Sequence, residues 1–336
     1  MVTKDAARRV KLIANPSSGG DPAKATERLE RVTRCLQDMN VSVDVALAHP
    51  VKEAVPIARR AVKDGYSTVI AMGGDGTISA VIRGLADSDA HLGIIPAGTE
   101  NDIAYSLGIP EDIEEACKLI VSDHTRNLDL AQITTKDKKK FVFFMVATIG
   151  LTTTLYPDIK DVPHGDFSNI KDAVLNFLHA KPDPKIYLTL DDESKIELEF
   201  MLVTITNTPV IGAKNLVAPD ASTEDGLLDI AVYPNFTKAE LLVYFARTAG
   251  EQKAPDGKIQ RYRARKIKIR TEPKLDIAAE GVMLGTGKAK IKVLPQALHV
   301  IAPDPHVAGA EKPVEETAQE LPAPVSITVG ADAESH

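Results

Sequence analysis

The stretch AMGGDGTISAVIRGL, residues 71–85, places three glycines around one aspartate, between an apolar run and a segment with helical spacing. It predicts a buried strand that ends in a turn and enters a helix. Glycine lets backbone N–H groups approach an anion closely, and a helix N-terminus adds partial positive charge. The turn therefore predicts a phosphate site in which Asp75 acts through a divalent cation. The alternative is a tight turn in which Asp75 caps the helix.

Strands and helices alternate on both sides of this stretch. Strands are expected at 10–14, 41–48, 67–72 and 92–98, and helices at 25–39, 51–65 and 77–87. This alternation favours right-handed crossovers and a parallel sheet covered on both faces. We expect residues 1–125 to form an α/β nucleotide-binding domain.

The pattern changes after about residue 125. Short strand-like runs joined by polar turns predict a β-sandwich over 126–303, whose last strand could return to the N-terminal domain. Only 168–180 and 237–250 have helical spacing in this part. Residues 304–336 are rich in Pro, Ala and Glu and predict a disordered tail.

Composition narrows the class of protein. A net charge of -7 over 336 residues argues against a nucleic-acid binder. Two cysteines, Cys35 and Cys117, indicate neither a disulfide framework nor a zinc site and fit a cytoplasmic protein. No apolar run approaches the ~20 residues that span a bilayer, so any membrane contact is expected to be peripheral.

Two further polar turns follow predicted strands. Asn15 to Gly20 follow the first strand, and Pro96 to Asp102 follow the fourth. Since ligands of parallel α/β sheets bind beyond the carboxyl ends of the strands, the three turns predict one pocket. The Walker motif, the full dinucleotide fingerprint and GxSxG do not occur.

These motifs together resemble the diacylglycerol kinase catalytic-domain family, which includes bacterial lipid kinases, sphingosine kinases and ceramide kinases. The resemblance covers nearly all of residues 10–302, and includes Pro219-Asp220-Ala221 followed by Asp225-Gly-Leu-Leu-Asp229. It implies ATP-dependent phosphorylation of a hydroxyl on diacylglycerol or a related lipid, with Mg²⁺ as cofactor. It also implies an α/β domain and a β-sandwich flanking a cleft.

The resemblance assigns roles to individual residues. Asp75 and Asp102 would join a magnesium–phosphate network, although Asn101-Asp102 could also cap a helix. A structural magnesium would use Asp225, Ser222 or Thr223 and the Leu227 carbonyl, with a metal-free hairpin turn as the alternative. The implied nucleotide contacts are Asn15, Ser18, Gly19, Gly73, Gly74, Asp75, Gly76, Thr77, Thr99 and Asn101.

Three positions depart from the family pattern. Ser79-Ala80-Val81 stands where the family usually has x-Asn-Glu-Val, and Ala48 where it commonly has threonine. The catalytic Asp-Gly-Glu becomes Glu280-Gly281-Val282 when counted back from the C-terminal end of the fold. Because valine cannot accept a proton, we predict that Glu280 is the general base. The alternative is a protein that binds nucleotide or lipid with little turnover.

The run KIQRYRARKIKIR, residues 258–270, carries seven Lys or Arg. It could contact anionic lipid headgroups, or be the solvated face of an ordinary strand. The partners expected are therefore a lipid alcohol and the inner face of a membrane, with no nucleic acid, and a homodimer is an open option. An NAD kinase shares GGDGT but fits PAGTEND and the DGLLD segment poorly.

Overall fold

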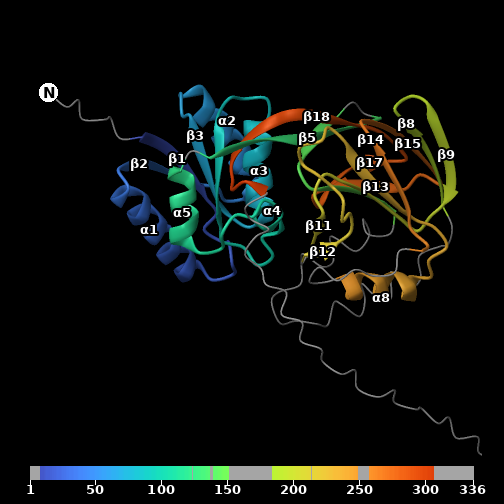
Figure 1. Ribbon diagram of the computed structural model, residues 1–336, viewed down its shortest axis with the longest axis horizontal. Helices are drawn as coiled ribbons and strands as arrows, with labels where there is room; N and C mark the ends of the chain where they lie inside the picture. The colour runs from blue at the N-terminus through green and yellow to red at the C-terminus, as the bar shows by residue number, and fades with distance from the viewer. Residues whose placement is uncertain are drawn as a thin grey trace, which may run out of the picture.

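The structure is a computed structural model that describes residues 8–122, 124–136, 139–150, 184–212, 214–248 and 257–305. An α/β domain and a β-rich domain lie side by side (Figure 1). The expected helix at 168–180 and residues 306–336 of the expected tail lie outside the described residues. Among the described helices, none combines the length and apolar character needed to cross a bilayer.

The N-terminal domain contains a parallel sheet of four strands in the order β2-β1-β3-β4. These strands span Val41–Leu47, Arg8–Ala14, Thr68–Gly73 and His91–Pro96. Helices α1 (Pro22–Asp38) and α5 (Ile113–Val121) pack on one face of the sheet. Helices α2 (Ala54–Lys63) and α3 (Asp75–Leu85), preceded by the short η1 (Val51–Glu53), pack on the other. The predicted α/β architecture is confirmed, while α5 was not anticipated.

The C-terminal domain is an antiparallel sandwich, as predicted. One sheet consists of β5 (Thr125–Thr135), β6 (Lys140–Phe143), β8 (Lys185–Leu190), β9 (Ser194–Glu199), β15 (Lys266–Glu272) and β18 (Lys288–Ile301). The other consists of β7 (Val146–Gly150), β10 (Leu202–Thr206), β13 (Leu228–Tyr233), β14 (Gln260–Ala264), β16 (Asp276–Ala279) and β17 (Val282–Thr286). Their facing apolar side chains form one core, and the expected second helix is α8 (Lys238–Thr248).

Strand β18 joins the two domains. Its end pairs in parallel with β4 at His299 and Val300, its first part pairs antiparallel with β15, and β5 pairs antiparallel with it along most of its length. The register with β5 shifts between Leu294 and Leu298. The result is a single sheet of ten strands that runs through both domains (Figure 1).

Two sequence runs that read as single strands are each divided between the sheets. The run at 139–150 forms β6 in one sheet and β7 in the other, and the chain crosses at Phe144-Met145. The basic run at 258–270 likewise forms β14 and β15, which lie in different sheets. In this run the three arginines that end at Arg265 occupy alternate positions, and the alternation of charged residues shifts by one residue from Lys266 onward. The change of sheet at Arg265 explains this shift.

Candidate active site

The three predicted turns meet at the carboxyl ends of β1, β3 and β4. The Asn15 amide donates to the Met72 carbonyl at 3.2 Å, and the Ala97 amide donates to the Gly73 carbonyl at 2.9 Å. The side chain of Asn15 reaches Thr77 Oγ1 at 3.4 Å. Residues far apart in sequence therefore form one polar edge, as expected for a ligand site of a parallel sheet.

Glycine is required where the turns after β3 and β4 touch. A Cβ added to Gly98 would lie 2.4 Å from Gly74 Cα, and one added to Gly73 would lie 2.6 Å from Thr77 Cβ. By contrast, a Cβ on Gly76 would have no heavy atom within 4 Å. Gly73, Gly74 and Gly98 are thus fixed by packing, whereas Gly76 faces open space.

Helix α3 begins at this contact without a side-chain cap. Its N-cap residue, Gly74, is extended, and no side chain hydrogen-bonds to the cap. Asp75 does not cap its own helix, because its Oδ1 accepts a hydrogen bond from the Ile103 amide at 2.8 Å. That amide belongs to the first turn of α4 (Asp102–Ser106). The positive end of α3 is therefore left to a ligand.

Asn101 and Asp102 have separate roles. Asn101 has φ 54°, and its side chain bonds back to the amide and carbonyl of Gly98, at 2.9 and 3.2 Å. Asp102 is buried, and its Oδ1 accepts from the Lys214 amide of the C-terminal domain at 2.9 Å. Asn101 shapes the turn, and Asp102 connects the domains.

Asp102 and Asp75 form an acidic pair that suits a hard cation. Burial raises the pKa of Asp102 above its usual value, and the negative charge of Asp75 raises it further. The amide of Lys214 opposes this shift. Two nearby carboxylates whose charges repel are suitable ligands for Mg²⁺, which binds proteins through one or two carboxylates. In the described part of the chain, no group of three or more His, Cys, Asp or Glu residues could hold a metal.

A small pocket opens beside the turn that follows β3. Its volume is about 160 Å³, and its walls include Asn15, Ser18, Leu47, Met72 and Ala97. The Arg28 guanidinium closes one side by donating to the Ala97 carbonyl at 3.0 Å. Mostly apolar walls with a few polar groups are typical of a small-molecule site. The predicted contacts Asn15 and Ser18 line this pocket, and Thr99 lies exposed on the neighbouring turn.

Glu280 lies in the two-residue turn between β16 and β17. Both turn residues have positive φ, 47° at Glu280 and 72° at Gly281, as in a type I′ hairpin. Oε1 accepts from the amides of Phe144 at 2.7 Å and Met145 at 3.1 Å. Oε2 accepts from Arg83 Nη1 at 3.0 Å. The carboxylate thus joins α3, the β6–β7 crossing and the hairpin.

The burial and the hydrogen-bond donors of Glu280 determine whether its carboxylate can accept a proton. Burial raises the pKa of its carboxyl, while the Phe144 amide, Arg83 and Ser79 oppose that shift. Three donors occupy three of the roughly four lone-pair sites of a carboxylate. Ser79 and Glu280 are both positions that depart from the family pattern, and the Ser79 side chain contributes to lowering the pKa of Glu280. Because the Ser79 side chain is a fourth hydrogen-bonding partner, Glu280 could accept a proton from a substrate hydroxyl only if one of these groups moved away. Val282 is 40% exposed.

The loop predicted to hold a structural magnesium is closed by an ion pair. The Asp225 carboxylate pairs with Arg263 and accepts from the Leu227 amide at 3.0 Å. Ser222 Oγ accepts from the Glu224 amide at 3.3 Å. Arg263 supplies the positive charge that a metal would bring, so these residues fit the metal-free turn better. The metal role of Ser222, Asp225 and Leu227 stays a prediction.

Asp129 organises this loop and was not singled out from the sequence. It is buried, and its carboxylate accepts from the Gly226 amide at 2.6 Å and the Gln296 amide at 2.8 Å. Its amide donates to the Thr223 carbonyl at 2.7 Å. The signal in the sequence is the single aspartate inside the apolar run LDLA, because a buried strand rarely contains an aspartate unless its carboxylate is hydrogen-bonded or paired.

Two family models match the chain. The diacylglycerol kinase catalytic domain matches residues 9–133, and the YegS C-terminal NAD kinase beta sandwich-like domain matches residues 171–302. A probable lipid kinase YegS-like from Pseudomonas aeruginosa is 30% identical over 267 residues, which cover 75% of this chain and 82% of that protein. The chain belongs to the diacylglycerol kinase catalytic-domain family.

Other family members agree in extent. A diacylglycerol kinase from Bacillus subtilis is 27% identical over 305 residues, which cover 88% of this chain and 97% of that protein. The crystal structure of a putative diacylglycerol kinase from Bacillus anthracis matches with a TM-score of 0.69 at 24% identity, covering 89% and 98% of the two chains. The family is one of kinases, and the Bacillus anthracis structure shares the two-domain fold of this chain.

Proposed function

We propose that the protein transfers the γ-phosphoryl group of ATP to a hydroxyl of diacylglycerol or a related lipid. The observation that carries this proposal is the backbone contact of Gly74 with Gly98, beside the uncapped N-terminus of α3 and the Asp75–Asp102 pair. Phosphoryl transfer depends chiefly on positioning and on charge stabilisation, and this arrangement supplies both. Family membership supports the kinase activity, and the lipid acceptor is the proposed part.

Each part of the site has a role in this proposal. The amides of Gly74, Asp75 and Gly76 at the start of α3 bind the phosphates. Thr77 contributes its hydroxyl, because its amide donates to the Gly74 carbonyl. The pocket next to Asn15 and Ser18 takes the adenine. Asp75 and Asp102 would hold Mg²⁺, which when bound neutralises charge on the phosphate oxygens. We place the activity in the cytoplasm, at the inner face of the membrane, where ATP and lipid meet.

Glu280 remains our proposed general base, on condition that Arg83 or an amide releases it when substrate binds. A base of this kind contributes about 10²- to 10⁴-fold to a rate. Its present contacts favour a second candidate function, a nucleotide- and lipid-binding member of the family with little turnover.

One experiment separates these possibilities. The purified protein is incubated with labelled Mg·ATP and a lipid extract, and products are identified by mass. A phosphorylated lipid, lost in Glu280→Gln at unchanged ATP affinity, supports the kinase with Glu280 as base. Full turnover by Glu280→Gln removes Glu280 from the chemistry. ATP binding with no lipid product establishes the binding protein, and NADP formed from NAD would overturn both.

A further inference from the structure

Strands β15 and β18 place cations directly opposite one another on the outer face of the sandwich. The register pairs Lys266 with Lys292, Lys268 with Lys290, and Arg270 with Lys288. The residues between them, including Ile267, Ile269 and Ile291, point into the core. We call these six side chains the cationic face.

Such a register is unfavourable for folding alone. Like charges directly opposite on neighbouring strands destabilise a sheet, and here three such pairs are consecutive. Lys268 pairs with Asp192 at 2.5 Å, and Arg270 pairs with Glu272. Within the described residues, no carboxylate forms an ion pair with the other four, which are Lys266, Lys288, Lys290 and Lys292. In a chain of net charge -7, this concentration of positive charge points to an external anion.

The positive potential at this face is visible in a neighbouring carboxyl. The pKa of Asp192 is lowered, first by its hydrogen bond from Lys268 and further by the charges of Lys266 and Lys290. An anion arriving at the face would meet the same field.

The positive charge extends over the six strands of this sheet that belong to the C-terminal domain. One register row runs from Lys195 through Thr189, Lys268, Lys290 and Thr134 to Lys140, over six strands. At about 4.8 Å between strands, this row is about 24 Å wide. A single phosphate group cannot contact all of it, whereas a layer of headgroups can.

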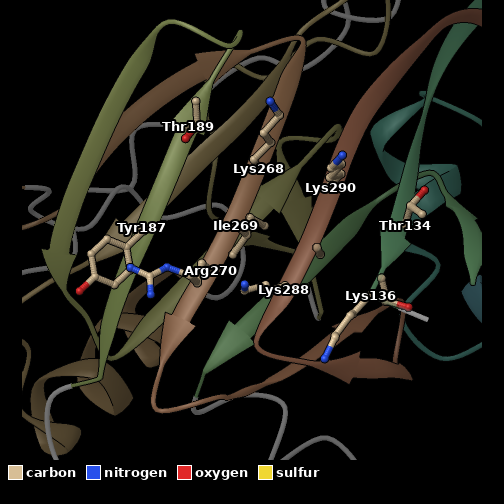
Figure 2. A pocket seen from close by; sticks show the side chains of 11 residues that line it. Thr134, Lys136, Tyr187, Thr189, Lys268, Ile269, Arg270, Lys288 and Lys290 are labelled. Atoms are coloured by element: carbon tan, nitrogen blue, oxygen red, sulfur yellow. The ribbon is translucent and has the colours of Figure 1, made fainter. Parts of the chain in front are cut away.

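A depression of about 520 Å³ lies within this row. Figure 2 shows side chains of neighbouring strands around it, with Lys268 and Lys290 on β15 and β18 and Thr134 on β5. Lys136, Arg270 and Lys288 complete its positive lining. Ammonium, guanidinium and hydroxyl donors around one hollow match the acceptor oxygens of phosphate.

We propose that the cationic face docks the protein on a bilayer of anionic phospholipids, with headgroup phosphates seated in the depression. The choice of a bilayer rests on the proposed lipid substrate and on the width of the face. Single-stranded nucleic acid fits less well, because it needs open aromatic rings, and the ring of Tyr187 is covered by Arg270 at 3.9 Å. The face recruits the protein and is separate from the candidate active site.

The test uses the full chain without ATP. Binding is measured by co-sedimentation with vesicles of phosphatidylcholine, alone or mixed with phosphatidylglycerol. The variant K266Q/K288Q/K290Q/K292Q removes the four lysines that lack an ion pair among the described residues. The matched control R34Q/K52Q/R59Q/K63Q changes net charge equally at exposed positions of the N-terminal domain.

We expect binding only to the anionic vesicles, weakened by salt. Each lysine removed should lower affinity about fivefold, so the fourfold variant loses at least about two orders of magnitude. The control variant should bind like the parent. The melting temperature of the fourfold variant should be equal to or above the parent's, because three like-charge pairs are relieved.

Several results would contradict the proposal that the cationic face docks on a bilayer. These are equal loss of binding in both variants, equal binding to neutral vesicles, or retention of phosphatidylglycerol binding by the fourfold variant. Stronger binding to single-stranded RNA or to soluble inorganic phosphate than to vesicles would overturn it too.

Turnover on a short-chain diacylglycerol in detergent separates this proposal from the proposed function. If the fourfold variant keeps that turnover and loses turnover on vesicles, both proposals are supported. Detergent turnover without selective vesicle binding refutes docking alone. Selective vesicle binding without any lipid phosphorylation refutes the kinase proposal alone.

Discussion

Asp102 and Glu280 are two buried carboxylates that each hold the domains together, and their surroundings are opposite. Asp102 accepts from the Lys214 amide, and the charge that acts most strongly on its pKa is the negative charge of Asp75. Glu280 accepts from two amides and pairs with Arg83. Burial raises the pKa of both carboxyls. The first site has a deficit of positive charge, and the second already contains its cation.

This difference separates a ligand site from a structural contact. A buried carboxylate without a cation is costly, so Asp102 and Asp75 are where an external cation gains most. Glu280 gains little from one, because Arg83 is held against it with a side-chain exposure of 17%. The site at Asp75 and Asp102, which we propose binds Mg·ATP, therefore lacks a cation that a ligand could supply, while the carboxylate of Glu280 is already paired with Arg83.

The largest effect is expected from Arg83→Met, which makes Glu280 resemble Asp102 by removing its cation. Breaking a buried ion pair in this way costs about 3–5 kcal/mol of unfolding free energy. Urea unfolding at neutral pH measures it. The double variant Arg83→Met/Glu280→Gln should recover much of the loss, and no recovery would mean that the packing of Arg83 on Phe141 matters more than its charge.

Gly98→Ala changes the turns that carry Asp75 and Asp102. The new Cβ would lie 2.4 Å from Gly74 Cα, so the two turns must separate, at a cost of about 3 kcal/mol. Thermal unfolding and ATP affinity should both fall. Gly76→Ala is the control, since open space surrounds it, and its stability should change by less than about 1 kcal/mol.

Asp102→Asn tests whether the Asp75–Asp102 pair, which has no cation of its own in the described structure, binds an external one. If Asp102 holds Mg²⁺ as proposed, removing its carboxylate should lower the rate of phosphoryl transfer about 100-fold. Without Mg²⁺, the stability of the variant at neutral pH should equal or exceed that of the parent, because the amide oxygen can still accept from the Lys214 amide and no buried charge remains at this position. Asp87→Asn, at an exposed position with positive φ, is the control. A variant with undiminished Mg²⁺-dependent turnover would contradict the assigned role.

The smallest effect is a pH dependence of stability in the absence of metal. Because burial raises the pKa of Asp102 in the folded protein, the folded state holds that proton more tightly than the unfolded chain. Stability relative to Asp102→Asn should therefore fall as pH rises from the ordinary carboxyl pKa through the raised one. Saturating Mg²⁺ should abolish the fall, and a rise with pH would show that the carboxylate is already compensated.

The sequence predicts the N-terminal domain well, because the hydrophobic period and the turn residues agree there. Gly73 to Thr77 and Asn101 were placed at the right edge by strand order alone. The crossing at Phe144-Met145 leaves no signal in a uniformly apolar run, whereas the crossing at Arg265 leaves only a change in the phase of the charged residues. The partners of Glu280 were equally hidden, because Arg83 is 197 residues away in the chain.

The long strand β18 restricts how the two domains can move relative to each other. Since it pairs with β4 in one domain and with β15 in the other, no hinge of unpaired chain separates the two halves at this point. Any change in the angle between the two domains must then twist a continuous sheet, most easily near Leu294 to Leu298, where the register with β5 is interrupted. The stiffness of this one sheet therefore limits how far the two domains can move relative to each other.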